Sequence, residues 1–421
     1  GNPNDDTRSP QISDDGRYIA YASIATDSDV ENPGAIPEGG LPYVVLYDAE
    51  TKTRRIVTTA PDGSALESGF GGVNWFDEFS LSGNGRYLFY STDAGNAHPE
   101  RSNVSNEDYF WLYRRDLETG EIMVAGKNET GEVPPGNMTT PSASGNGQRI
   151  LFTGAFIGGN GLVSGYLNPF GTDLFWKDLE SGQVVRITQT EDGGVPDGFL
   201  SGSSLSPDGL LVAFASTSTN LLVPDDENFF DIYSVAIFPG ESRIEMGLVS
   251  EGPDPSLNVD FSSGPIAADT YVLFNTRQWA EMLGEPDAND ASIHGIAVGT
   301  FPAPPPDQGA RISILEDETV GFMPLALSAD GTRALIIERE AGFQLWEVGI
   351  GLTDVPGTEG VNRSTMTSHT NSDLTAMIGR RFASGGQEDV YYSEATGAVV
   401  MPPAPNQGDA SLDLHAVLDD G

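Results

Sequence analysis

Short stretches in which apolar and polar residues alternate, separated by tight turns, recur along the whole chain. In the stretch 203–217, SSLSPDGLLVAFAST, a short strand is followed by an Asp208-Gly209 turn and by a second alternating strand. An Asp-Gly pair between two such runs is a strong signal for a hairpin, because glycine adopts the positive φ that the turn requires. The pattern therefore predicts a β-hairpin at this position and at each of its copies.

The turn glycines of the hairpins set the period of the repeat. Four of them are separated by 69, 62 and 62 residues: Gly16, Gly85, Gly147 and Gly209. The next clear copy has its glycine at Gly331, which is 122 residues further on, or two steps of 61. A copy is therefore expected between them, and PIAADTYVLFNT at 265–276 occupies the right place. A degraded copy follows at 366–379, which brings the number of copies to seven.

Each copy contains four segments with a period of two residues, and none has the pattern of a convincing amphipathic helix. Self-similarity at this spacing in an all-β sequence is typical of a propeller, whose blades bury their faces against one another. We predict a single domain over 1–405, an all-β, seven-bladed β-propeller with four antiparallel strands per blade. The expected blades cover approximately 9–60, 76–130, 138–190, 200–250, 258–316, 320–357 and 362–403. A tail strand follows within 406–421.

Three motifs of the repeats resemble the TolB-like, WD-repeat-like β-propeller family. They are S-x-D-G-R-Y-I-A-Y at 13–21, D-L-F-W-x-D-L-E-x-G at 173–182, and R-I-T at 186–188. The resemblance extends over roughly 9–403. It implies the propeller fold and is almost silent on activity.

The order of the strands predicts where the connections lie. If the strands run from the centre to the rim, the first and third turns of each blade share one face, and the other connections share the opposite face. The former are tight, whereas the latter are long: 24–42, 60–78, 92–108, 155–171, 190–202, 217–229 and 277–291. Loops on a rigid scaffold commonly carry binding residues, so we expect a binding site on this long-loop face.

Composition narrows the classes of partner. The chain has 62 acidic and 21 basic residues and a net charge of −41, which argues against nucleic acid and anionic lipid as partners. No run of 18 apolar residues is present, so no membrane insertion is expected. The start at Gly1-Asn2-Pro3 is consistent with a processed end. We expect an exported protein that is secreted or extracellular, or lies at the cell surface, with the periplasm as the alternative.

Several long loops are rich in oxygen ligands of the kind that Ca²⁺ prefers, although none matches an EF-hand loop. The first candidate metal ligands are Asp225, Asp226, Asn228 and Asp231, and the next are Asp27 and Asp29. The alternative is that these side chains are solvated turn residues. Ca²⁺ is the one cofactor that the sequence suggests.

Catalytic signals are weak. The four histidines, His98, His294, His369 and His415, fall in separate contexts. A propeller-type polysaccharide lyase would use His, Arg or Tyr to bind or deprotonate an acidic sugar, and His369 with Arg380 and Arg381 is the candidate for such a group. GFLSG and GLVSG are not the G-x-S-x-G motif of α/β-hydrolases. We therefore expect no catalytic residues.

Aromatic residues and the tail are the candidate contacts for a partner. Aromatics in long loops can anchor a partner or pin the loops to the blades; they are Phe70, Trp75, Phe76, Phe156, Tyr166, Phe170, Phe199 and Trp279, of which Trp75 and Phe76 are preferred. In the tail SLDLHAVL, one face of a strand carries Leu412, Leu414, Ala416 and Leu418. This strand can dock on its own ring or add to an open blade edge of another copy, which would give a filament.

The sequence thus favours a non-catalytic propeller that binds proteins or serves in an assembly through its long-loop face and its tail, with itself as one possible partner. The alternative is a carbohydrate-active propeller that binds or cleaves a polysaccharide in its central funnel.

Overall fold

The computed structural model describes residues 7–26, 29–68, 79–101, 109–157, 161–165, 168, 171–190, 192–222, 230–241, 244–249, 265–268, 271–276, 295–300, 312–316, 323–328, 330, 332–338, 342–347, 350–355, 369–370, 374, 376–383, 386–393 and 397–400.

These residues form seven antiparallel sheets of four strands, numbered here 1 to 7 in chain order. Sheet 1 contains β1 (Thr7–Ile12), β2 (Tyr18–Ser23), β3 (Tyr43–Asp48) and β4 (Thr53–Ile56). Sheet 2 contains β5 (Phe79–Leu81), β6 (Tyr87–Thr92), β7 (Trp111–Asp116) and β8 (Ile122–Val124). Sheet 3 contains β9 (Gly136–Ala143), β10 (Arg149–Phe156), β11 (Asp173–Asp178) and β12 (Val184–Arg186). Sheet 4 contains β13 (Leu200–Leu205), β14 (Leu211–Ser216), β15 (Asp231–Ile237) and β16 (Ile244–Leu248).

The remaining three sheets lie in the second half of the chain. Sheet 5 contains β17 (Ile266–Ala267), β18 (Tyr271–Thr276), β19 (Gly295–Thr300) and β20 (Ile312–Glu316). Sheet 6 contains β21 (Met323–Leu327), β22 (Arg333–Glu338), β23 (Gly342–Glu347) and β24 (Gly351–Asp354). Sheet 7 contains β25 (His369–Thr370), β26 (Ala376–Ala383), β27 (Gly386–Ser393) and β28 (Gly397–Val400). Strands therefore occupy the place between the hairpins at 209 and 331 where the spacing predicts a further copy.

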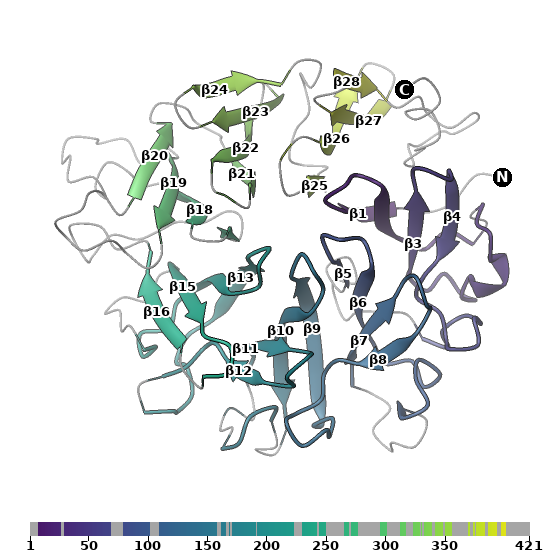
Figure 1. Ribbon diagram of the computed structural model, residues 1–421, viewed down its shortest axis with the longest axis horizontal. Helices are drawn as coiled ribbons and strands as arrows, with labels where there is room; N and C mark the ends of the chain where they lie inside the picture. Colours follow the sequence, from purple (N-terminus) through teal and green to yellow (C-terminus); the bar gives the residue numbers. More distant parts are fainter. Residues whose placement is uncertain are drawn as a thin grey trace.

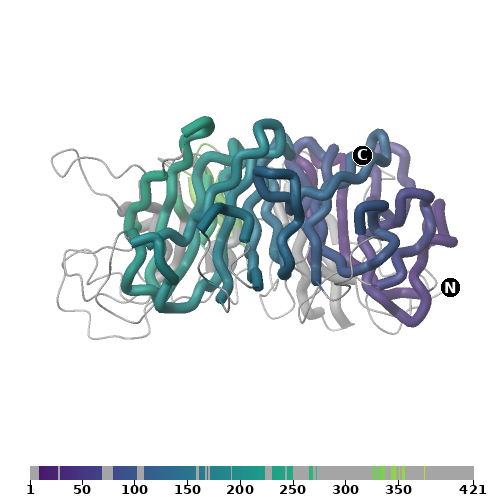
Figure 2. Tube along the Cα trace, turned by 90° about the horizontal axis from the view of Figure 1, so that it is seen from below, coloured from purple at the N-terminus to yellow at the C-terminus, as the bar shows by residue number. Residues whose placement is uncertain are grey.

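The sheets are arranged around a common centre, with the first strand of each innermost (Figure 1). Inner strands of successive sheets contact one another, and β1 contacts β25, which closes the ring. Seen from the side, the molecule is a flat disc (Figure 2). The predicted all-β propeller with four antiparallel strands per blade is confirmed. Every sheet consists of four consecutive strands, so among the described residues the ring closes without strand exchange.

The recurrent hairpin turn is held by its own side chains. At the fourth turn, Ser206 Oγ donates to Asp208 Oδ1 at 2.6 Å, and the Leu211 amide donates to Ser206 Oγ at 2.9 Å. Gly209 has φ +75°, the conformation that the Asp-Gly signal predicts. The same pair of side-chain bonds recurs at four other serines: Ser13, Ser82, Ser144 and Ser328.

A second set of hydrogen bonds joins the innermost strands of neighbouring sheets. The residue two positions before the turn serine accepts a bond from a backbone amide of the next sheet. Thus the Ala143 amide donates to Ser80 Oγ at 3.0 Å, and the Ala267 amide donates to Ser204 Oγ at 2.6 Å. Leu81 with Gln11, and Leu205 with Ser142, make the equivalent bonds. These bonds fix the spacing of the sheets around the centre.

Ion pairs connect the first and third turns of a sheet. Arg86 Nη2 lies 2.8 Å from Asp116 Oδ2, and Arg17–Asp48 and Arg149–Asp178 are the equivalent pairs. Partial burial opposes ionisation of Asp116, but hydrogen bonds from Arg86 and from two turn amides outweigh it and hold the pKa of this carboxyl below its usual value. These contacts confirm that the two tight turns share one face.

Apolar side chains fill the space between successive sheets. One cluster joins sheets 3 and 4 through residues such as Leu151, Trp176, Phe214 and Tyr233. Trp176 is fully buried, and its indole Nε1 donates to the carbonyl oxygen of Gly209 in the next sheet at 2.8 Å. Packing and hydrogen bonding together therefore set the angle between the blades.

Candidate functional site

The aromatic residues of the long loops differ sharply in exposure. Phe156 is 1% exposed, and its ring meets the ring of Phe175 edge-on with centroids 5.5 Å apart. Phe199 is 78% exposed. Phe156, which the sequence places in a long loop, is the last residue of β10 and packs in the core, whereas Phe199 is presented to solvent. Trp75 and Phe76 lie outside the described residues, so their predicted role in binding stays a prediction.

Phe199 belongs to the connection between β12 and β13, which is joined to the connection that follows β14. Thr190 and Leu221 form an isolated β-bridge, and the Leu222 amide donates to the Gln189 carbonyl at 3.0 Å. Both connections lie on the long-loop face. We call residues 195–199 together with 217–221 the Phe199 platform.

Asp197 is the centre of the polar contacts in the platform. Its Oδ1 accepts a bond from the Thr219 amide at 2.7 Å, and its Oδ2 accepts one from Thr219 Oγ1 at 2.6 Å. The Asp197 amide donates to Asn220 Oδ1 at 3.1 Å, while Asn220 Nδ2 donates to the Val195 carbonyl at 2.9 Å. Four bonds between two loops leave little freedom to the backbone that carries Phe199.

The backbone of Phe199 is also fixed directly. Its amide donates to Thr217 Oγ1 at 2.9 Å, and its carbonyl accepts the Thr217 amide at 3.0 Å. At the preceding residue, Gly198, a Cβ atom would lie 2.4 Å from the backbone nitrogen of Ser218. Only glycine permits this close approach of the two loops. The ring of Phe199 therefore stands in solvent on a backbone that is held in place.

The connection that carries the exposed ring also carries the acidic side chains of Asp192 and Asp197. Partial burial opposes ionisation of Asp197, but the bonds from Thr219 outweigh it and lower the pKa of this carboxyl. The Gly194 amide and the Thr190 hydroxyl lower the pKa of Asp192. Both groups are therefore ionised at neutral pH. Val195, 41% exposed, adds a second apolar side chain to the same loop.

A buried polar network lies beneath the platform. Asp173 is fully buried; its Oδ1 accepts bonds from Arg186 Nε at 3.1 Å and from the Thr188 hydroxyl, and its Oδ2 accepts one from Asn168 Nδ2 at 2.9 Å. Arg186 Nη1 also donates to the Gly194 carbonyl at 3.0 Å. Residues of the D-L-F-W and R-I-T motifs thus anchor the loop that leads to Phe199.

Similarity to known proteins is confined to solved structures. Neither the scan of family models nor the search of curated proteins gives a match. A puromycin-hydrolysing peptidase from Mycobacterium tuberculosis is 13% identical, with a TM-score of 0.53 over 95% of this chain and 54% of that one. A prolyl endopeptidase is 14% identical, with a TM-score of 0.52 over 94% of this chain and 49% of that one. TolB from Acinetobacter baumannii is 16% identical, with a TM-score of 0.36 over 70% of this chain and 52% of that one.

The likeness is one of fold. This chain spans about half the length of these three solved structures. TolB structures are among these neighbours. No helix among the described segments is long and apolar enough to cross a membrane.

The predicted Ca²⁺ ligands are mostly outside the described residues, which include only Asp29 and Asp231 of the six. Asp29 is exposed, whereas Asp231 is buried at the start of β15, where its backbone pairs with Ser216. Within the described part of the chain, no three His, Cys, Asp or Glu side chains are grouped to hold a metal. The site at Asp225, Asp226 and Asn228, and the one at Asp27, stay predictions.

The histidines that the structure describes lie in different parts of the ring. His98 follows β6 in sheet 2, and its Nδ1 accepts the Glu100 amide at 3.2 Å. His369 begins the innermost strand β25 of sheet 7, and Arg380 and Arg381 lie in the neighbouring β26. His294 and His415 lie outside the described residues, as do the tail residues Leu412, Leu414, Ala416 and Leu418.

Sequence reasoning identified Phe199 only as one of eight loop aromatics and missed Val195, Asp197 and Thr219. The segment 192–199, DGGVPDGF, does contain a sign of this exposure. Its two apolar residues, Val195 and Phe199, stand among turn-forming residues in a long connection.

Proposed function

We propose that the chain is an exported, seven-bladed propeller that acts as a non-catalytic module for binding a polypeptide through its long-loop face. The observation that carries this proposal is Phe199, a large apolar side chain exposed on a backbone held by hydrogen bonds. Interface hot spots are typically aromatic residues that enter a pocket of the partner. A fixed backbone lowers the entropic cost of binding, because the loop is ordered before the partner arrives.

The acidic side chains in the same connection as Phe199 define the complementary surface. A partner suited to this site presents an apolar pocket for the ring and basic residues at its rim, facing Asp192 and Asp197. The high acidic content of the whole chain supports a basic partner as well.

The tail is the second proposed contact. The segment 411–418, for which the sequence predicts a strand with one apolar face, is suited to adding to the rim of a blade, in its own ring or in another copy. Sedimentation velocity of the full chain and of a chain ending at 405 tests this part. Assembly that requires 406–421 supports exchange between copies, and assembly that survives the truncation refutes it.

The experiment for the long-loop face begins with a photo-reactive amino acid at position 199, which identifies the cross-linked partner in the cells that produce the protein. The purified partner is then titrated against the unmodified chain, Phe199→Ala and Ile350→Ala. Ile350 is the matched control, because it is 66% exposed but lies in the tight turn between β23 and β24 on the other face.

Losing the burial of a phenylalanine is expected to cost about 2 kcal/mol, or roughly a 30-fold rise in Kd. Ile350→Ala is expected to leave Kd unchanged. Equal Kd values for Phe199→Ala and the unmodified chain would refute the proposed contact.

A further inference from the structure

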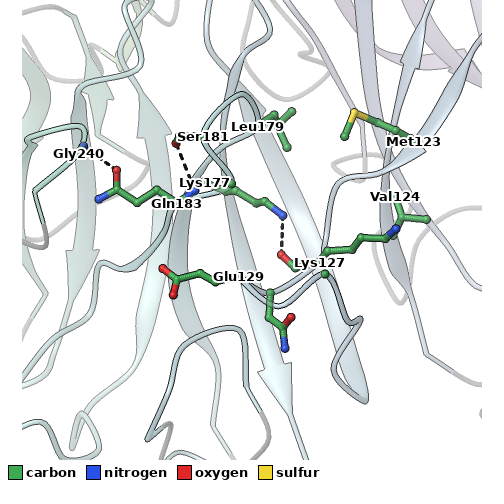
Figure 3. Close-up of a pocket in the computed structure, with 12 residues that line it drawn as sticks. Met123, Val124, Lys127, Glu129, Lys177, Leu179, Ser181, Gln183 and Gly240 are labelled. Atoms are coloured by element: carbon green, nitrogen blue, oxygen red, sulfur yellow. Dashed lines mark hydrogen bonds between the residues drawn. The ribbon is translucent and has the colours of Figure 1, made fainter.

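A cavity of about 560 Å³ lies between sheets 2, 3 and 4 (Figure 3). Phe199 and the rest of its platform are not part of the lining. Its walls come from the segment after β8, from the end of β11 and the turn that follows it, and from Gly240. Gln183 Oε1 accepts the Gly240 amide at 2.9 Å, which ties the wall of sheet 3 to sheet 4. The cavity is therefore bounded by three blades whose relative positions are fixed.

Lys177 is a charged group in the wall of this cavity that is only 5% exposed. Its Nζ donates to the carbonyl oxygens of Ala125, at 2.8 Å, and Lys127. Among the described residues, no carboxylate forms an ion pair with Lys177. Burial, with a smaller effect of the nearby Lys127 charge, lowers the pKa of Lys177 to about 8. The ammonium group is therefore still largely charged at neutral pH although it lacks a counterion.

The other sheets show that the fold does not require a cation at this position. Lys177 lies in the third strand of sheet 3, where its backbone pairs with the residue three positions after the turn glycine of that sheet. The residues at the equivalent position of sheets 1, 2 and 4 are Tyr47, Arg115 and Val235. Tyr47 and Val235 are fully buried without a positive charge. Arg115 donates to Thr59 of the preceding sheet, so a cation here can serve as a structural link. Of the four equivalent positions, those in sheets 1 and 4 carry no cation and so do not form this link to the preceding sheet.

A buried, unpaired ammonium group is costly, because it loses hydration without gaining an opposite charge. An anion in the cavity would supply that charge. Lys127, whose Nζ lies 2.8 Å from Glu100 Oε1, adds a second ammonium group to the lining, and Gln183 and Ser181 add polar groups. Glu129 also lines the cavity and favours a ligand with a single negative charge over one with several.

A second hollow of about 740 Å³ adjoins the first and shares Asn128 and Glu129 with it. Its lining includes the apolar side chains of Val133, Leu162 and Val163. The loop between the two hollows is ordered, since Asn128 Oδ1 accepts bonds from the Thr130 and Glu132 amides. A ligand with a charged end and an apolar body fits the two hollows, with its charged end in the first and its apolar body in the second.

We infer that this pair of hollows binds the carboxy-terminal end of a polypeptide, with the terminal carboxylate on Lys177 and the preceding residues along the second hollow. The site is separate from the Phe199 platform and does not rest on its function. A sugar acid carries the same charged group, and the experiment separates the two sources.

The probe is the peptide N-acetyl-Val-Gly-Gly with a free carboxylate, and the control ligand is its carboxamide. Both are titrated by NMR against the full chain labelled with ¹³C at the lysine ε-carbons. The carboxylate is expected to bind at least about tenfold more tightly than the amide, which is what one charge-assisted hydrogen bond contributes. Through linkage, the same factor raises the pKa of Lys177 by about one unit in the complex.

Three variants accompany the titration. Lys177→Met is expected to bind the carboxylate about tenfold more weakly and to lose the difference between acid and amide. Lys52→Met, at an exposed lysine in the turn before β4, and Phe199→Ala are expected to bind like the unmodified chain. Lys177→Met removes two hydrogen bonds, so this variant can fail to fold. In that case the NMR signal of Lys177 in the unmodified chain decides whether the carboxylate binds there.

Equal affinity for acid and amide, or an unchanged Lys177 signal at saturating peptide, would overturn the inference. D-glucuronate is tested against D-glucose in the same way. A shift of the Lys177 signal with glucuronate but not with the peptide would also overturn the assignment to a polypeptide end.

Discussion

Gly147 offers a sharp test of how the blades are held together. It has φ +65°, and a Cβ atom built on it would lie 2.4 Å from Cδ2 of Tyr87 in the preceding sheet. Tyr87 is buried, and its ring lies beside the guanidinium groups of Arg86, at 5.2 Å, and Arg114, at 4.4 Å. The ring therefore has little room to move away from an added methyl group.

The cost of Gly147→Ala has two parts. A non-glycine residue in the left-handed region costs about 1–2 kcal/mol. Overpacking against Tyr87 adds about 1–3 kcal/mol, because the contact is far inside van der Waals distance. The expected loss in the free energy of unfolding is therefore about 2–5 kcal/mol.

Gly120→Ala is the matched control. Gly120 has φ +78°, but the nearest atom to its added Cβ is Arg115 Nη2 at an ordinary 3.8 Å. This variant is expected to lose only the conformational part, about 1–2 kcal/mol. Urea unfolding followed by tryptophan fluorescence measures both losses.

A double-mutant cycle isolates the contact between the sheets. Tyr87→Ala removes the ring that clashes and leaves the Cβ of residue 87, 3.0 Å from the added Cβ, so Gly147→Ala should cost little more than its conformational part in that background. Equal losses for Gly147→Ala and Gly120→Ala, or no coupling between positions 147 and 87, would refute the view that these glycines serve the contact between blades.

Four further outcomes are expected. Ser80→Ala should lower the free energy of unfolding by about 1 kcal/mol, since it leaves the Ala143 amide without its acceptor; a loss no larger than for an exposed serine would contradict this. Because burial lowers the pKa of Lys177 from 10.5 to about 8, the folded state holds fewer protons between these pH values, and stability should rise with pH across this window by at most about 3 kcal/mol relative to Lys177→Met. Millimolar Ca²⁺ should raise the melting temperature if Asp225 and its neighbours bind it, and identical curves with Ca²⁺ and with chelator would count against the site. Deleting 406–421 should leave the melting temperature of the propeller unchanged, and a large fall would show that the tail belongs to the ring.

The elements that are predictable from the sequence are those specified by neighbouring residues. Turn glycines such as Gly209 are marked by the residue before them, and even the degraded copy at 265–276 follows from spacing alone. The bond between Ala267 and Ser204 could not be predicted, because its partners are 63 residues apart and meet only when the sheets are arranged.

The candidate sites were predictable only in outline. The sequence places both Phe156 and Phe199 in long loops, and their opposite exposure depends on whether a partner such as Phe175 lies within reach. Lys177 occupies the variable position of the D-L-F-W-x-D motif, where the sequence gives no sign of burial. Exposure and burial are properties of packing between sheets, and the alternating pattern describes only one sheet at a time.

Because each blade is one uninterrupted stretch of chain, the propeller can be assembled in the order in which it is synthesised. A blade has all of its strands once its own stretch of roughly sixty residues has left the ribosome. Each new blade can then pack against the blade that was synthesised before it. The contact between β1 and β25 is the exception, since it joins the first blade to the last. The surface of the first blade that β25 covers therefore stays exposed until nearly the whole chain has been synthesised. In a stalled or shortened product, this surface would remain accessible to other chains in the cell.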